Sequence, residues 1–118
     1  MGLDMQLVDQ YDNELMYWRK ANAIHNWFIQ NCLDGKDKND GKKILITREK
    51  LSELLKVCLK VLYDSKRANV FLPVDGYLSS MRDTWYFQDI INTINTIGDI
   101  LDNDDNEKPI QVYYTSSW

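Results

Sequence analysis

The sequence predicts a small α+β protein in which an antiparallel sheet, made from the two ends of the chain, packs against about three helices. Three observations support this fold class. The 118 residues suit one domain spanning residues 1–118. Apolar and polar residues alternate with a period of two at both ends of the chain. Three internal stretches instead repeat apolar residues three or four positions apart, as amphipathic helices do.

The two ends of the chain have the pattern of strands. Leu3, Met5 and Leu7 fall on one face of a short extended segment. Near the other end, Pro109 blocks helix continuation, and residues 110, 112 and 114 are apolar or aromatic positions on one face. Two such strands hide their apolar faces most simply by pairing with each other under a layer of helices.

Helical spacing predicts the three internal elements. The first helix is expected over residues 14–31, with an apolar stripe through Trp18, His25 and Phe28. The second begins after a Thr47 cap and carries a broad leucine stripe to residue 62. The third starts near residue 84 and runs to about residue 101, although many of its residues are β-branched. A short extended segment is expected at residues 44–46, between polar loops.

Composition narrows the classes of function. The net charge of −4 provides no positive field for phosphate backbones, so general nucleic-acid binding is not expected. No apolar run reaches membrane-spanning length and no signal peptide is recognisable, which favours the cytosol over a membrane. Cys32 and Cys58 lack any CxxC or Cys/His spacing, so both are expected to be free, buried thiols in a reducing compartment.

No residue pattern indicates a metal or a cofactor. The glycines form no phosphate-binding loop, and both acidic turns lack the ligand pattern of a calcium loop. His25 is the only histidine, which excludes a paired-imidazole site. No catalytic residue is assigned, and a non-enzymatic role is favoured. The enzymatic alternative is a small hydrolase or transferase that uses His25 as base with Asp4 as its orienting carboxylate.

Residues 17–28 combine aromatic, amide and cationic side chains, and they carry most of the functional interest. One hypothesis is a pocket for a small polar ligand such as a nucleotide. Its residues would be Trp18, Arg19, Asn22, His25, Asn26 and Trp118. The favoured alternative is that the aromatic rings fill the core, where His25 is hydrogen-bonded, while Arg19 and the amides fix the terminal strands.

A second hypothesis is an exposed aromatic patch that captures a partner protein. Trp27, Tyr77 and Trp85 are the candidate anchors, since tryptophan and tyrosine are enriched in interface hot spots. Packing of Trp27 under the irregular segment that follows the second helix is the other interpretation. A homodimer formed through strand edges or the leucine-rich helix is a third possibility.

Three segments resemble a widespread family of small, uncharacterised phage and prophage proteins. They are the opening MGLDM, the segment YWRKANAIHNWF at residues 17–28, and the ending YYTSSW at residues 113–118. Residues 46–51 and 72–87 are also similar to that family, so the likeness covers nearly the whole chain. It implies a viral or prophage context in a bacterial cytosol, and no particular reaction. The expected function is therefore an accessory protein that acts by binding, for example as an inhibitor of a host factor or of a defence component. The alternative is a module that binds or sequesters a small, nucleotide-like ligand.

Overall fold

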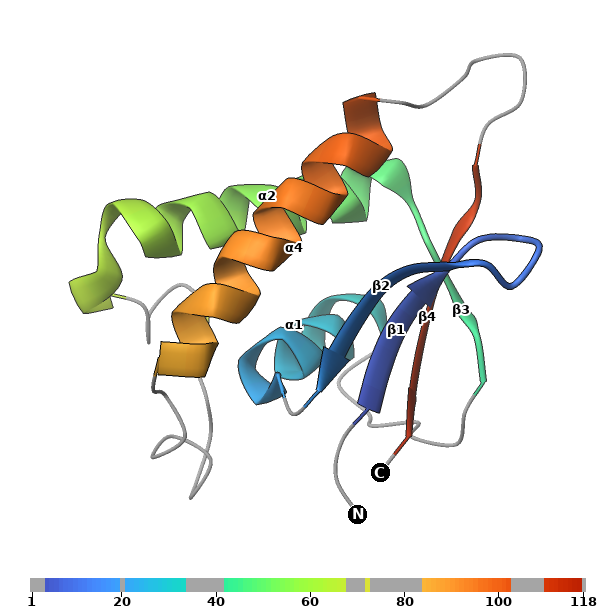
Figure 1. The fold of residues 1–118 in the computed structure, drawn as a ribbon, viewed down its shortest axis with the longest axis horizontal. Coiled ribbons are helices and arrows are strands. Elements are labelled where there is room, and N and C mark those ends of the chain that lie inside the picture. Colours follow the sequence, from blue (N-terminus) through green and yellow to red (C-terminus); the bar gives the residue numbers. More distant parts are fainter. Residues whose placement is uncertain are drawn as a thin grey trace.

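The sheet and the helices form two layers, as the predicted α+β class requires (Figure 1). The structure is a computed structural model that describes residues 4–19, 21–33, 42–67, 72, 84–102 and 110–117. Within these residues it contains four strands in one antiparallel sheet and three α-helices on one side of that sheet. No helix in the described ranges is both long and apolar enough to cross a membrane.

The strands are ordered β2-β1-β4-β3 across the sheet. β1 spans Asp4–Val8, β2 spans Glu14–Arg19, β3 spans Ile44–Ile46 and β4 spans Val112–Ser117. The predicted pairing of the two terminal strands is confirmed, because β1 lies antiparallel to β4 with Leu7 opposite Tyr114. The short segment at residues 44–46 is also extended, and it pairs with β4 as an edge strand.

The prediction of one helix over residues 14–31 is wrong in its first half. Residues 14–19 form β2, and α1 begins only at Asn22 and ends at Cys32. The misreading arose because Leu15 and Trp18 fit a helical spacing, while Met16 and Trp18 fit a strand spacing equally well. Pairing with β1 decides between them, since it buries Met16 and Trp18 together and leaves Tyr17 exposed.

A tight turn at residues 9–13 joins β1 to β2. Asp9 accepts hydrogen bonds from the backbone N–H groups of Tyr11 and Asn13 and from the Asn13 side chain. Desolvation raises the pKa of Asp9, but these hydrogen bonds lower it and hold it below its ordinary value. Asp12 has a positive φ of 65°, a conformation that Asp and Asn tolerate better than most residues.

The second and third predicted helices are confirmed. α2 spans Arg48–Tyr63, and the Thr47 side chain caps it by accepting a hydrogen bond from the Lys50 N–H. α4 spans Thr84–Asp102. A short 3₁₀ turn, η1, at Ser65–Arg67 follows α2. α2 and α4 pack against each other, and the Arg48 side chain donates to the Leu101 carbonyl at the end of α4.

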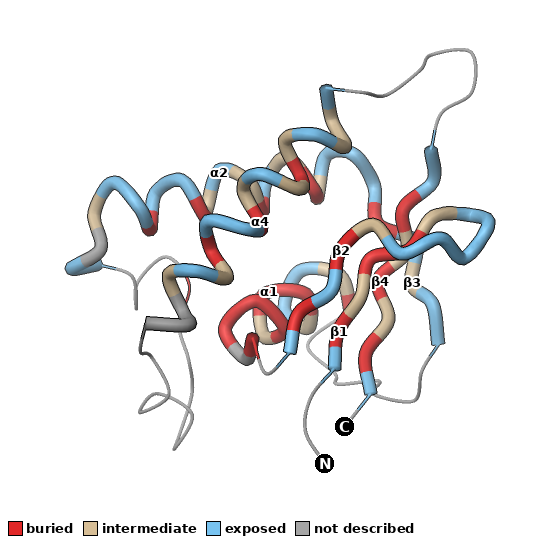
Figure 2. The backbone as a smooth tube through the Cα atoms, viewed as in Figure 1, coloured by how far each residue is buried: buried red, intermediate tan, exposed pale blue. Residues whose placement is uncertain are grey.

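The core lies between the sheet and the helices, where the buried positions of every element converge (Figure 2). The sheet contributes Met5, Leu7, Trp18 and Tyr114, and most of their neighbours along the strands are half-buried or exposed. The helices contribute one stripe each, including the leucines of α2 and the isoleucines of α4. This two-layer arrangement leaves the opposite face of the sheet free of the described helices.

Candidate binding surface

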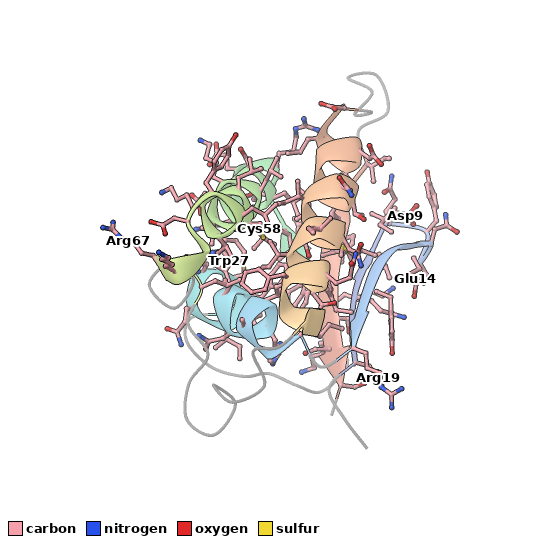
Figure 3. All side chains as sticks on the ribbon, turned by 60° about the vertical axis from the view of Figure 1, so that its left-hand side comes forward. Asp9, Glu14, Arg19, Trp27, Cys58 and Arg67 are labelled. Atoms are coloured by element: carbon pink, nitrogen blue, oxygen red, sulfur yellow. The ribbon has the colours of Figure 1, made fainter. Side chains whose placement is uncertain are left out.

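The described members of the predicted ligand pocket are divided between the core and the opposite face of the sheet. Trp18 and Arg19 are adjacent on β2, so their side chains project to opposite faces of the sheet. Trp18 is buried under the helices, whereas Figure 3 shows Arg19 pointing away from them. Asn26 is half-buried on α1. The Asn22 side chain and Trp118 lie outside the described residues.

His25 is a core histidine, as the favoured interpretation predicted. Its Nδ1 atom lies 2.6 Å from the hydroxyl oxygen of Tyr114, and both side chains are buried. Asp4 projects from the other face of the sheet, where its carboxylate accepts a hydrogen bond from the Tyr17 hydroxyl. The sheet therefore separates His25 from the carboxylate that the hydrolase alternative requires.

The buried indole of Trp18 is also satisfied within the core. Its Nε1 donates to Thr93 Oγ1 over 2.8 Å, and that hydroxyl in turn donates to the Asp89 carbonyl over 2.7 Å. The chain of bonds ties β2 to the middle of α4. Because buried polar groups without partners are costly, this link fixes how the helix lies on the sheet.

Trp27 is not an exposed anchor for a partner protein. Only 7% of its surface is accessible, and its ring packs edge-on against Phe28 with the ring centres 5.2 Å apart. Figure 3 places it on the helix side of the molecule. The irregular segment under which Trp27 was predicted to pack lies almost wholly outside the described residues. Tyr77 lies outside the described residues. Trp85 belongs to the first turn of α4, but its side chain is outside the described part.

The two cysteines are free thiols, as expected. Cys58 is buried, but Cys32 is only half-buried, so the prediction of two buried thiols is wrong for Cys32. Desolvation dominates the pKa of both. Burial raises the pKa of Cys58 from 9.0 to about 12. Burial likewise raises the pKa of Cys32 to about 11, with small opposing effects from Lys50 and Glu53. A rise of this kind favours the neutral thiol over the reactive thiolate.

We expect both thiols to react slowly with Ellman's reagent at pH 8 in the folded protein. For Cys32, the shift from 9.0 to about 11 makes the thiolate about 100-fold scarcer. The control is the chain unfolded in guanidinium, in which both should react at once. Immediate reaction of Cys58 in the folded state would contradict its burial.

The raised pKa values of the two thiols also affect stability. The free energy of unfolding should fall as the pH rises from about 9 towards 12, because the thiols of the unfolded chain ionise first.

The outer sheet face is the surface that the sequence interpretation missed. Its side chains come from alternate positions of β1 and β4 and from Tyr17 and Arg19 of β2, and they meet in cross-strand rows. Glu14 joins them because the register of β1 and β2 shifts at Leu7 and Val8. Gln6, for example, lies between Tyr17 and Thr115 in the sheet. We define the outer sheet face by these residues: Asp4, Gln6, Glu14, Tyr17, Arg19, Tyr113, Thr115 and Ser117.

Hydrogen bonds between neighbouring strands order part of this face. The Tyr17 hydroxyl donates to Asp4 over 2.5 Å, and Gln6 Nε2 donates to Glu14 over 3.0 Å. The bond to Asp4 is the main reason that the pKa of Tyr17 is raised. Tyr17 nevertheless keeps 47% of its surface exposed. The outer sheet face thus presents the Tyr17 ring, fixed by its hydrogen bond to Asp4, among charged and hydroxyl groups.

An apolar groove of about 260 Å³ lies at the β3 edge of the sheet, between β3, the start of α2 and the end of α4. Leu45, Ile100, Ile110 and Val112 line it, together with the first turn of α2. Leu45 is 54% exposed and pairs directly with Tyr113 in the sheet. Leu45 therefore lines the groove and also neighbours the outer sheet face, whereas Tyr113 is not part of the groove lining.

No cluster of His, Cys, Asp and Glu able to hold a metal occurs in the part of the chain that the structure describes. Comparison with protein-family models, with curated proteins and with solved structures finds no match to this chain.

Proposed function

We propose that this protein is a phage or prophage accessory protein that acts in the bacterial cytosol by binding a host protein. The resemblance of residues 17–28 and of both chain ends to phage and prophage proteins supports the context. The observation that carries the binding role is the exposed outer sheet face, with Tyr17 among polar groups and an apolar groove beside it.

The chemistry of this surface suits a folded protein partner. Interface hot spots combine aromatic and arginine side chains with an apolar pocket, surrounded by polar groups that exclude water. Tyr17 and Arg19 provide the aromatic and arginine side chains, and the groove at Leu45 provides the apolar pocket. A partner that inserts an apolar side chain into the groove would at the same time cover Tyr113 and its neighbours. A host factor or a host defence component fits this description.

Affinity purification from infected or expressing host cells tests the proposal. The bait is the full chain, compared with a Tyr17→Ala/Arg19→Ala variant and with a Leu45→Asp variant. Tyr63→Ala is the matched control, because Tyr63 is 90% exposed but lies on α2, on the helix side of the sheet. A host protein should be retained by the wild type and the control, and lost from both surface variants.

The affinity of the identified partner then measures the effect. We expect the outer-face substitutions to weaken binding of the purified partner about 30-fold or more, the effect of removing a hot spot. Circular dichroism should show that all variants fold. Equal binding by the surface variants and the wild type would refute the assignment to this surface.

A further inference from the structure

The two edges of the sheet differ in length. β2 forms one edge with six residues, whereas β3 forms the other with three. β1 is the only strand beside β2, so alternate backbone N–H and C=O groups of β2 point out of the sheet at this edge. Among the described residues, no hydrogen bond reaches these outward groups. The chemistry of the β2 edge therefore suits one kind of partner, an extended strand.

The two faces of β2 set a condition on that strand. Met16 and Trp18 are buried on the helix side, whereas Tyr17 and Arg19 are exposed on the outer sheet face. Residues that lie opposite each other in neighbouring strands share a face of the sheet. A strand that extends the sheet must therefore place apolar residues opposite Met16 and Trp18, and a residue suited to solvent opposite Tyr17.

A second copy of β2 meets this condition. In an antiparallel pair centred on Tyr17, this residue lies opposite Tyr17 of the other copy, and Met16 lies opposite Trp18. Buried positions then face buried positions, and exposed positions face exposed ones. Paired positions differ by an even number in this register, so the residues with outward backbone groups in one copy meet their counterparts in the other.

The charges at the two ends of β2 favour this antiparallel direction. Glu14 begins β2 and Arg19 ends it, and Figure 3 shows both on the side away from the helices. In the pair centred on Tyr17, Arg19 of each copy lies opposite Leu15 of the other, one position from Glu14. Opposite charges thus meet at both ends. Neither charge forms an ion pair with a described residue, although Asp4 of β1 lies opposite Arg19.

We propose that two copies of this chain associate by antiparallel pairing of their β2 edges. The pairing joins the two sheets into one, with a two-fold axis perpendicular to the sheet at Tyr17. The helices of both copies lie on one side of the joined sheet, and the two outer sheet faces become a single surface on the other side. The association needs only this chain, so it does not depend on the proposed host partner.

Disulfide crosslinking tests the register. Tyr17→Cys is made in a Cys32→Ser background, because Cys32 is only half-buried. Opposite residues of an antiparallel pair have Cα atoms about 4.5–5.5 Å apart, which suits a disulfide. Gln6→Cys in the same background is the matched control, since Gln6 lies opposite Tyr17 on β1. Its two copies would be about 14 Å apart, three strand spacings, which is too far for a disulfide.

We expect air oxidation of the purified chain to give a covalent dimer of the Tyr17→Cys variant and not of the Gln6→Cys variant, measured by non-reducing electrophoresis. Circular dichroism verifies that both variants are folded. Equal crosslinking of the two variants, or none of either, would overturn the proposed pairing, because the two Tyr17 positions would then not lie opposite each other.

Sedimentation equilibrium tests the charge arrangement. We expect the wild type to be a dimer at concentrations on the order of 100 µM, and Arg19→Glu and Glu14→Arg each to weaken association about tenfold, because like charges then meet at both ends. A mixture of these two variants should associate more tightly than either alone, since each end then pairs an acid with a base. Arg67→Glu is the matched control, because Figure 3 shows Arg67 on the opposite side of the molecule from Arg19.

The outcomes separate this proposal from the one about a host protein. A monomeric wild type at these concentrations would overturn the self-association. A dimer that Arg19→Glu and Glu14→Arg leave intact, alone and in the mixture, would also overturn it, because another surface would form the contact. Leu45→Asp lies at the other edge of the sheet and should leave the dimer unchanged. Loss of host binding in that variant therefore reports on the host partner alone.

Discussion

Replacing Trp18 with alanine is expected to lower the free energy of unfolding by about 3–5 kcal/mol, the usual cost of deleting a large aromatic side chain from a core. Trp18 is fully buried, and its ring centre lies 6.0 Å from that of Phe28 in an edge-on arrangement and 6.5 Å from that of Tyr114. The cavity would open where β2, α1 and α4 meet. Guanidinium denaturation followed by circular dichroism measures the effect.

Tyr17→Ala is the control for this substitution, because it removes the neighbouring aromatic ring of β2 from the exposed face. We expect it to cost less than about 1 kcal/mol. Trp18→Phe removes the N–H that donates to Thr93 together with part of the ring. A double-mutant cycle with Thr93→Val separates the hydrogen bond from the lost volume and should give a coupling of about 1 kcal/mol. Equal losses for Trp18→Ala and Tyr17→Ala would mean that the indole is not in the core.

A second large effect is expected at Tyr114. Tyr114→Phe should lower the free energy of unfolding by about 1–3 kcal/mol. Tyr114→Phe keeps the ring that stacks on Phe28, with the ring centres 3.9 Å apart and the planes 13° from parallel. It removes the hydroxyl that lies 2.6 Å from Nδ1 of His25. The loss leaves a buried polar atom of His25 without that partner, which costs more than the hydrogen bond itself contributes.

Tyr113→Phe provides the matched control for Tyr114→Phe. Tyr113 is the adjacent residue of β4, but it is only half-buried, and its hydroxyl donates to the exposed Gln111 side chain. The expected change in the free energy of unfolding is within about 0.5 kcal/mol. In a His25→Leu background, Tyr114→Phe should cost less than it does in the wild type. An unchanged cost in that background would show that the two side chains are not energetically coupled.

The elements that the sequence predicted well are those in which local pattern and tertiary packing agree. α2 has a capping threonine and an unbroken leucine stripe, and its predicted start is correct. The terminal strands alternate cleanly and have no competing period. The helix prediction for residues 14–19 was wrong because their apolar positions fit a helical and a strand spacing equally well. Only the contact with β1 favours a strand. A tertiary contact of this kind is not visible in a local window.

The error in β2 also explains why the candidate surface was missed. A helix over residues 14–31 would have placed Arg19 beside His25, whereas the strand places Arg19 on the face away from it. The alternation of Met16, Tyr17, Trp18 and Arg19 was the available signal for an outward row. The prediction of His25 as a core residue did not depend on that error, because His25 and Phe28 lie within the true α1.

The position of β4 in the sheet affects how the protein can fold during synthesis. β4 lies between β1 and β3, yet its residues leave the ribosome after those of both neighbours. Until then β1 can pair only with β2, and β3 has no strand beside it within the sheet. In a nascent chain that ends before residue 112, Met5 and Leu7 of β1 would therefore be only partly covered. Nascent chains of this protein should bind chaperones until β4 emerges, after which the sheet can close in a single late step.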